Sequence, residues 1–138
     1  MQIRSFQPDD EAAVIALWER CGLLRPWNDP RKDIQRKLVV RPDLFLVEVL
    51  ENEVVATAMA GDEGHRGWIN YLAVDPTHRR SGLGRAIMDE AERLLRESGC
   101  PKVNLQVQST NTEVIDFYRS LGFTVEDVVN LGKRLEHD

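Results

Sequence analysis

The spacing of apolar and polar positions along the chain predicts a series of short strands and helices. Runs of apolar, β-prone residues predict strands at 3–6, 44–50, 54–60, 68–74, 102–107, 123–129 and 130–135. Apolar residues three or four positions apart predict helices that begin near Asp9 or Asp10, Arg31, Leu83 and Thr110. The expected order is βααβββαβαββ, which belongs to the α/β (α+β) class.

Glycine and capping residues mark where these helices and turns are expected to begin or end. Gly22, Gly99 and Gly122 each follow a helical run and are expected to stop it. Thr110 and Glu113 have the spacing of a capping box, in which two side chains bond the first N–H groups of a helix. Residues 51–53, Glu-Asn-Glu, are expected to form the turn of a hairpin.

Length and charge limit the classes of protein to which the chain can belong. With 138 residues, of which 42% are hydrophobic, it is expected to form a single domain over residues 1–138. A formal net charge of −5 disfavours nucleic acids and anionic membranes as partners, because both require a basic surface. Neither a membrane-length apolar run nor a signal peptide is recognisable, so a cytoplasmic location is expected.

Cysteine content argues against a disulfide framework or a metal site. The two cysteines, Cys21 and Cys100, have neither C-x-x-C spacing nor histidine partners. They are expected to be reduced thiols, and no metal is expected.

Residues 68–87 form the most informative stretch, in which a strand passes through a turn into a glycine loop that opens a helix. Asp75 and Pro76 form the turn, and residues 79–84 then present backbone N–H groups at the helix N-terminus. Those N–H groups and the helix dipole favour a phosphate. Glycines allow close approach of a ligand, and the arginines 79, 80 and 85 add positive charge.

Three other interpretations of this loop are available. A dinucleotide-binding fingerprint would have a third glycine where Ile87 stands, and a P-loop would have Gly-Lys-Ser/Thr, which is absent. The third interpretation is an ordinary tight turn with solvated arginines. The strand before the loop and the amphipathic helix after it favour an anion site.

These residues resemble the GNAT family of acetyl-CoA-dependent N-acetyltransferases. The sequence 79–84, RRSGLG, matches the family's R/Q-x-x-G-x-G/A loop. LAVDP at 72–76, Asn111, Phe117-Tyr118 and LGF at 121–123 follow the family pattern in the same order. The motifs LLRPWND, GHRGW and LGKRL make it most similar to small bacterial stand-alone enzymes of the YpeA type. The resemblance implies a mixed, mostly antiparallel central sheet flanked by helices.

The resemblance also implies a binding site for acetyl-CoA. Backbone amides of the loop would hold the pyrophosphate, and backbone groups of residues 72–74 would pair with pantetheine as an added strand. An N–H near Leu72 or Ala73 would polarise the thioester carbonyl. Asn111 would bond pantetheine, and Tyr118 would be the general acid for the departing thiolate. The implied coenzyme-binding residues are Leu72, Ala73, Val74, Arg79, Arg80, Ser81, Gly82, Leu83, Gly84, Arg85, Asn111 and Tyr118.

The general base is left open by the sequence. Relatives that acetylate ribosomal protein N-termini have a glutamate on the fifth strand, where this chain has Gln106, and an amide cannot serve as a base. Other relatives carry a glutamate on the fourth strand, and residues 68–71 contain none. Four loop residues are the remaining candidates: Asp62, Glu63, His65 and Asp29.

The acceptor is expected to be a small-molecule amine or a peptide N-terminus. The loop between the first two helices builds one wall of the acceptor site in the family, so Trp27, Asn28, Asp29 and Tyr71 are candidate substrate residues. Trp27 either cages an ammonium by cation–π contact or covers the helix pair as a satellite core.

Two classes of function and two oligomeric states are compatible with the sequence. Direct acetyl transfer is favoured by Asn111 and Tyr118, whereas Gln106 leaves open a non-catalytic acyl-CoA-binding or sensing module. The protein is expected to be a monomer, or a homodimer that pairs through its terminal strands.

Overall fold

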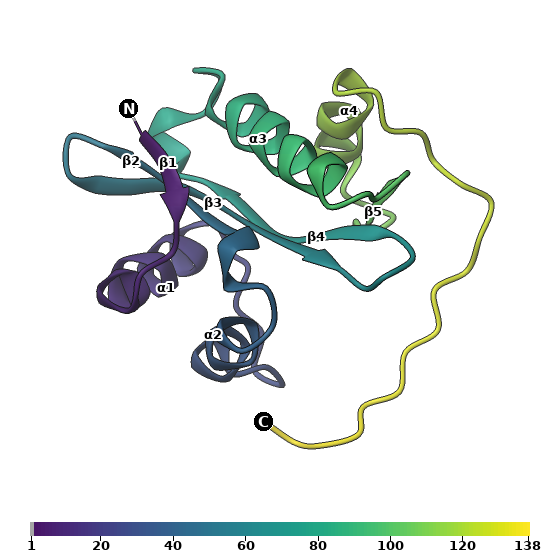
Figure 1. Ribbon diagram of the computed structural model, residues 1–138, viewed down its shortest axis with the longest axis horizontal. Coiled ribbons are helices and arrows are strands. Elements are labelled where there is room, and N and C mark those ends of the chain that lie inside the picture. The colour runs from purple at the N-terminus through teal and green to yellow at the C-terminus, as the bar shows by residue number, and fades with distance from the viewer. Residues whose placement is uncertain (1) are drawn as a thin grey trace. The chain divides into compact units, whose positions relative to one another are not determined.

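The computed structural model describes residues 2–138, and residues 2–105 contain a mixed sheet with helices packed against it (Figure 1). Within the described residues the sheet has five strands in the order β1-β2-β3-β4-β5. Their bounds are Gln2–Ser5, Phe45–Leu50, Glu53–Asp62, Gly67–Val74 and Val103–Leu105. The first three pairings are antiparallel and only β4 and β5 are parallel. The expected mixed, mostly antiparallel sheet is confirmed.

Helices pack on both faces of this sheet. Helices α1 (Glu11–Arg20) and α2 (Pro30–Leu38) cover one face, and α3 (Leu83–Glu97) covers the other (Figure 1). Short 3-10 turns, η1 (Pro8–Asp10), η2 (Pro42–Leu44) and η3 (Pro76–His78), connect these elements. Asp29 caps the first turn of α2, because its Oδ1 accepts the Arg31 N–H at 2.9 Å.

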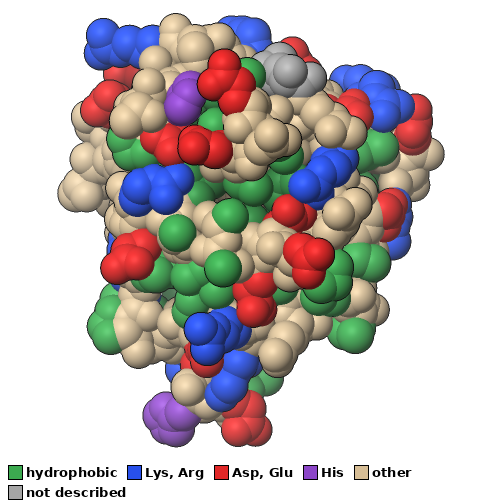
Figure 2. Space-filling model, turned by 90° about the vertical axis from the view of Figure 1, so that its left-hand side faces the viewer, with side chains coloured by type: hydrophobic (Ala, Val, Ile, Leu, Met, Phe, Trp, Pro, Cys, Tyr) green, Lys and Arg blue, Asp and Glu red, His purple; other side chains and the backbone are tan. Residues whose placement is uncertain are grey.

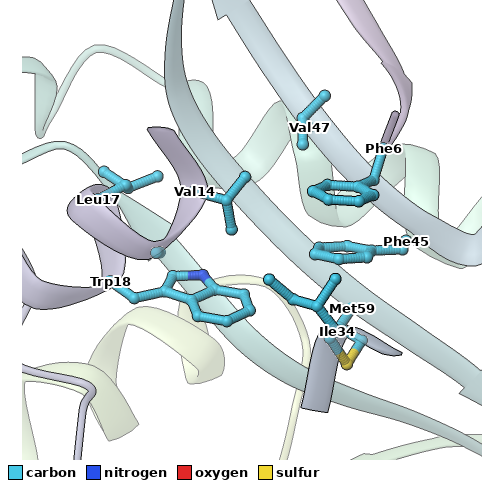
Figure 3. Close-up of a cluster of buried hydrophobic side chains, with 9 residues drawn as sticks. Phe6, Val14, Leu17, Trp18, Ile34, Phe45, Val47 and Met59 are labelled. Atoms are coloured by element: carbon cyan, nitrogen blue, oxygen red, sulfur yellow. The ribbon is translucent and has the colours of Figure 1, made fainter. Parts of the chain in front are cut away.

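The buried core between the sheet and the α1–α2 pair is aromatic (Figure 3). Phe6 and Phe45 stack with ring centroids 4.5 Å apart, and the indole of Trp18 lies beside Phe45. The cluster comprises Phe6, Val14, Leu17, Trp18, Ile34, Phe45, Val47, Met59 and Ala73. On the other face, α3 buries a stripe at helical spacing that includes Leu83, Ile87, Ala91 and Leu95.

By its contacts the chain divides into two units, which are described separately. One unit runs to Leu105 and includes Asp138, and the other covers residues 106–137. Helix α4 (Thr112–Ser120) belongs to the second unit. The single domain over residues 1–138 stays a prediction.

The second unit, residues 106–137, corrects four expectations. Residues 123–129 and 130–135 were expected to be strands, but they form no ladder in the structure and follow an irregular course (Figure 1). Most of their apolar side chains are exposed, Leu131 by 90%, because a β-prone sequence forms a strand only where a partner backbone takes up its hydrogen bonds. Strand β5 likewise ends at Leu105 instead of continuing to residue 107. The cap of α4 is Asn111 and not Thr110, because Asn111 Oδ1 accepts the Val114 N–H.

Candidate active site

A bulge in β4 interrupts the ladder in the middle of the sheet. Thr57 pairs with Ala73 and Met59 pairs with Asn70, so two residues of β4, 71 and 72, lie opposite one residue of β3. Tyr71 has a φ of 51°, which is rare for a residue with a side chain. The Thr57 hydroxyl donates to the Tyr71 carbonyl at 2.8 Å and so fastens the bulge to β3.

Beyond the bulge, β4 continues without β5 beside it. The parallel ladder joins residues 67–69 to β5 and ends at Ile69. Ala73 and Val74 therefore pair with β3 on one edge, and within the described chain residues 72–74 have no ladder to β5 on the other. The Val74 carbonyl accepts longer contacts from Arg79 Nε at 3.4 Å and Cys21 Sγ at 3.3 Å. An extended ligand can add to such an edge as a strand does.

Asp75 turns the chain from β4 toward the glycine loop. Its carboxylate accepts the backbone N–H of Thr77 at 2.9 Å and the guanidinium of Arg20 at 2.8 Å. The Thr77 N–H, the Thr77 hydroxyl and Arg20 together lower the pKa of Asp75 to about 2. The turn after β4 is therefore held by an ionised carboxylate.

The glycine loop leads into α3 through two left-handed residues. Arg80 has a φ of 66° and Gly82 a φ of 85°, and Gly82 is the N-cap of α3. The first intrahelical bond runs from the Ala86 N–H to the Gly82 carbonyl at 3.0 Å, so the N–H groups of residues 83–85 precede the helical ladder. A Cβ at Gly82 would meet nothing within 4 Å, which leaves the backbone open to a ligand.

The charge at this helix end suits an anion. The first turn of α3 contains no acidic residue. Arg79, Arg80 and Arg85 are exposed, whereas Leu83 and Gly84 are buried against the sheet. Backbone donors, the helix dipole and guanidinium groups are the donor set that binds phosphates. The residues that the sequence predicts to hold a pyrophosphate therefore fit that group.

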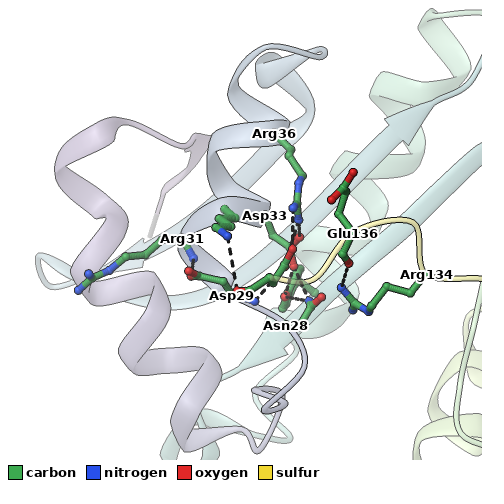
Figure 4. Close-up of polar contacts among 10 residues, drawn as sticks. Asn28, Asp29, Arg31, Asp33, Arg36, Arg134 and Glu136 are labelled. Atoms are coloured by element: carbon green, nitrogen blue, oxygen red, sulfur yellow. Dashed lines mark hydrogen bonds and ion pairs between the residues drawn. The ribbon is translucent and has the colours of Figure 1, made fainter.

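A second cluster of polar side chains lies on the α1–α2 face of the sheet and centres on Asp33 of α2 (Figure 4). Oδ2 of Asp33 accepts the Tyr71 hydroxyl at 2.7 Å and the Asn28 amide at 2.6 Å. Oδ1 accepts the guanidinium of Arg36 at 2.9 Å. Burial, and then the hydrogen bond to Asp33, raise the pKa of Tyr71 above its ordinary value, so its hydroxyl stays protonated.

Asp138 is held on the outer side of this cluster. Its carboxylate accepts Arg36 at 2.7 Å and the backbone N–H of Asp29 at 3.0 Å, and its carbonyl lies 3.5 Å from Lys32 Nζ. Arg36 therefore bridges two carboxylates. We name the set Asn28, Asp33, Arg36, Tyr71 and Asp138 the Asp33 cluster.

The structure brings together only some of the predicted acceptor residues. Asn28 and Tyr71 meet through Asp33, whereas the Asp29 side chain is occupied as the cap of α2. Trp27 is 61% exposed, so the alternative in which it forms a satellite core is wrong. Asp33 was missed because an aspartate three residues before an arginine on a helix is common, and nothing in the sequence points from it to Tyr71.

Three of the four candidate bases lie at the other end of β4. Asp62, Glu63 and His65 belong to the β3–β4 hairpin, next to Gly67. Asp62 Oδ1 accepts the Gly64 N–H at 2.8 Å, and Glu63 accepts the Arg66 N–H. At about 3.3 Å per residue, this end of β4 is roughly 17 Å along the strand from residue 72. The fold does not bring these three side chains to residues 72–74.

In the second unit, Asn111 and Tyr118 lie on α4. The Oδ1 of Asn111 accepts the Val114 N–H, and this cap does not use the amide N–H groups of Asn111. Tyr118 is buried, with its ring at 5.3 Å from Phe117 and 5.6 Å from Phe123. Burial raises the pKa of Tyr118 to about 12. Gln106 donates to Asn130 in the same unit.

The surface and the remaining side chains add little further chemistry. On the face seen in Figure 2, Lys and Arg are interspersed with Asp and Glu, unlike the basic surface that nucleic-acid binding requires. Among residues 2–138, no helix is both long and apolar enough to span a membrane. In the same range, no three His, Cys, Asp or Glu side chains are grouped to hold a metal ion. Cys21 and Cys100 are free thiols.

The sequence pattern of the Acetyltransferase (GNAT) family matches residues 11–123. The chain belongs to this family. An acetyltransferase of Pectobacterium atrosepticum is 49% identical over 138 residues, which cover 100% of this chain and 98% of that protein. The chain is therefore a bacterial-type N-acetyltransferase, and the YpeA subtype stays a prediction.

Solved structures share the GNAT fold. The ribosomal-protein-S18-alanine N-acetyltransferase of Escherichia coli is 25% identical, with a TM-score of 0.74 over 89% of this chain and 77% of that one. The PaiA N-acetyltransferase of Thermoplasma acidophilum, solved with coenzyme A, has a TM-score of 0.81 over 93% of this chain and 92% of its own. At 19% identity, the second likeness shows the fold alone.

Proposed function

We propose that this GNAT enzyme transfers an acetyl group directly from acetyl-CoA to the primary amine of a peptide N-terminus or a small molecule. The observation that carries the proposal is the continuity of two features. The ladder-free edge of β4 at residues 72–74 leads, through the Asp75 turn, into the N-terminus of α3. Acetyl-CoA has two matching parts in the same order. Its extended pantetheine arm corresponds to the strand edge, and the pyrophosphate that follows corresponds to the helix N-terminus.

In this proposal each part of the coenzyme has a partner of suitable chemistry. Backbone groups of residues 72–74 pair with the amides of the pantetheine arm, and the N–H groups of residues 80–85 bind the pyrophosphate. Bound acetyl-CoA supplies the activated thioester. The N–H of Leu72 or Ala73, next to the bulge, stabilises charge that develops on the thioester oxygen.

Asn111 and Tyr118 are proposed to bind pantetheine and the departing sulfur, as the family resemblance implies. A pKa of about 12 for Tyr118, compared with about 8.5 for a thiol, makes full proton transfer uphill by about 5 kcal/mol. Tyr118 therefore stabilises the thiolate mainly as a hydrogen-bond donor, and solvent completes its protonation.

An α-amino group is the acceptor that we propose. At pH 7 an α-amine with a pKa near ~8 costs about 1.4 kcal/mol to neutralise, and a lysine near ~10.4 costs about 4.6 kcal/mol. Relatives carry a glutamate at the position of Gln106, and this enzyme lacks it. Such an enzyme is better suited to an acceptor that loses its proton easily, which is the α-amine. The related E. coli enzyme, by its name, acts on an alanine of ribosomal protein S18.

The test is coenzyme A release, followed by thiol titration, with acetyl-CoA and a panel of amines. The panel holds amino acids, peptides with free or blocked N-termini, polyamines and aminoglycosides. We expect release that depends on a free α-amine. Absence of release across the panel, with tight acetyl-CoA binding retained, would contradict the proposal and favour a sensing module.

Gly82→Asp is the variant that links release to the proposed coenzyme site. It places a negative charge at the N-terminus of α3, where we expect acetyl-CoA affinity to fall at least 100-fold. Gly99→Asp is the matched control, because Gly99 also has a left-handed φ, of 91°, and open space around its Cβ, at the other end of the same helix. Equal losses in both variants would show backbone strain and not loss of an anion site.

A further inference from the structure

Tyr71 is held at three separate points by side chains of other elements. Its ring stacks on the indole of Trp18 with centroids 3.8 Å apart, and its carbonyl accepts the Thr57 hydroxyl at 2.8 Å. Its own hydroxyl donates to Asp33 at 2.7 Å. A left-handed φ of 51° is retained in spite of its strain because these contacts hold it. Strain that is stabilised in this way is typical of functional sites.

Asp33 is positioned as firmly as Tyr71. Its Oδ2 accepts both Tyr71 and Asn28, and its Oδ1 accepts Arg36. The dyad of Tyr71 and Asp33 thus places a carboxylate behind a neutral phenol.

The Tyr71 oxygen keeps one position for a further donor. A phenol oxygen donates one hydrogen bond and accepts two. Tyr71 donates to Asp33 and accepts one bond from the Asn28 amide at 3.2 Å. Tyr71 also comes immediately before residues 72–74, where the thioester is proposed to lie. An amine that approaches the thioester can therefore donate to Tyr71.

We infer that Tyr71 and Asp33 form a proton relay that deprotonates the acceptor ammonium, with Tyr71 as the group in contact with the amine and Asp33 as the residue that acts through it. This inference rests on the proposed acetyl transfer and assigns the base that the sequence leaves open. Neither residue was among the candidate bases.

The proton step balances without any further reactant. One N–H bond of the acceptor ammonium breaks as its proton bonds to the Tyr71 oxygen. The original Tyr71 proton passes to Oδ2 of Asp33, so the tyrosine ends neutral, the amine neutral and the carboxyl protonated. Asp33 then releases the proton to water. The neutral amine keeps its lone pair for attack on the acetyl carbon.

Polar and charged side chains surround the dyad. Arg36 and Asn28 face it, with Asp138 beyond Arg36 and Lys32 next to Asp138. The relay is assigned to an α-amine acceptor, whose proton is released more easily than that of a lysine side chain.

The test compares Tyr71→Phe and Asp33→Asn with the wild-type chain and with Glu90→Gln. Glu90 is the matched control, because Glu90 and Arg93 repeat the i,i+3 pairing of Asp33 and Arg36 on an exposed part of α3. The acceptors are an alanine-initiated peptide and the same peptide with a blocked N-terminus and one internal lysine. Acetyl-CoA affinity and thermal midpoint are measured for every variant.

We expect Tyr71→Phe and Asp33→Asn each to lower kcat about 100-fold at pH 7, with acetyl-CoA affinity within twofold of wild type. The Asp33→Asn rate should rise tenfold per pH unit and approach wild type above the pKa of the acceptor, because solvent then supplies the neutral amine. The double variant should lose no more than either single variant, since both act in one relay. Glu90→Gln should match wild type.

Three results would overturn the inference. A loss in Asp33→Asn that is the same at every pH shows a structural role only. A loss of kcat in the double variant that equals the product of the two single losses shows that Tyr71 and Asp33 have independent roles. Equal wild-type rates on the peptide with a free α-amine and on the lysine peptide would show that the enzyme does not prefer an α-amine as acceptor. Absence of wild-type release with both peptides and with every other amine of the panel instead contradicts the proposed function itself, so the two failures are distinguishable.

Discussion

The indole ring of Trp18 and the phenol ring of Tyr71 lie 3.8 Å apart by their centroids, with an angle of 13° between the ring planes. Trp18 comes from α1 and Tyr71 from the bulge of β4. The indole N–H also donates to Thr57 at 2.9 Å, and Thr57 in turn donates to the Tyr71 carbonyl. One buried side chain of α1 thus supports both the ring and, through Thr57, the backbone of Tyr71.

We predict that Trp18→Phe destabilises the protein by about 2–3 kcal/mol, because it shrinks a fully buried side chain and removes the hydrogen bond to Thr57. Urea unfolding measures this loss. Thr57→Val and the double variant complete a cycle, in which we expect a coupling energy of about 1 kcal/mol. Additive losses would show that the contact between Trp18 and Thr57 contributes nothing of its own.

From the contacts of Asp75 with Thr77 and Arg20 we predict that the free energy of unfolding depends on pH in the acidic range. The pKa of Asp75 is lowered to about 2, chiefly by the Thr77 N–H, from about 3.9 in an unfolded chain. Its carboxylate therefore stabilises the fold above pH 4, and this contribution is lost as the pH falls through 2. Asp75→Asn should cost about 1–2 kcal/mol at pH 7.

Urea unfolding from pH 7 down to pH 2 checks this prediction. The wild-type advantage over Asp75→Asn should shrink steadily below pH 4. Arg20→Gln serves as the companion variant and should cost less, because the Arg20 side chain is half exposed. A difference between wild type and Asp75→Asn that does not change with pH would contradict the assignment of the lowered pKa.

We predict that replacing Glu48 with methionine stabilises the protein. This β2 residue is 0% exposed, and in the described chain neither of its carboxyl oxygens has a hydrogen-bond partner. Burial raises the pKa of Glu48. Glu48→Met should therefore add about 1–3 kcal/mol at pH 7, because it removes an unpaired buried carboxyl at similar volume.

The sign of the pH effect at Glu48 is opposite to that at Asp75. Because the pKa of Glu48 is raised in the folded state, the contribution of Glu48 to wild-type stability is most favourable at low pH and falls as the pH rises above about 4.3. The gain from Glu48→Met should thus grow between pH 4 and pH 8 in thermal unfolding. Glu48→Gln is the control and should remove the pH dependence while it keeps an unpaired polar group. A gain that is constant with pH would mean that Glu48 has a hidden partner.

Tyr118→Phe tests the proposed donor to the departing sulfur. We expect kcat to fall about 10-fold to 100-fold, since one hydrogen bond to a developing thiolate is lost. Acetyl-CoA affinity and thermal midpoint should stay close to wild type, because the ring remains packed against Phe117 and Phe123. Steady-state kinetics at saturating acetyl-CoA measure the effect. Unchanged turnover would remove Tyr118 from the chemistry.

Local signals in the sequence determined the glycine loop and the helix that follows it. The left-handed φ of Gly82, the turn at Asp75 and the buried stripe of α3 all arise between neighbouring residues, so the expected positions agree with the structure. The same is true of the hairpin between β2 and β3, where Glu51 and Asn52 have left-handed φ. Short-range sterics and hydrophobic periodicity decide such features, and both can be read along the chain.

Only the tertiary structure decided which groups meet across the sheet. Asp33 and Tyr71 are 38 residues apart and meet because α2 packs over the bulge of β4, and neither residue type at its own position indicates the other. The expected strands at 123–129 and 130–135 failed for a related reason, because pairing depends on a partner backbone that composition does not supply. The sequence by itself therefore determined the family and the position of its glycine loop, while long-range packing decided the candidate proton relay.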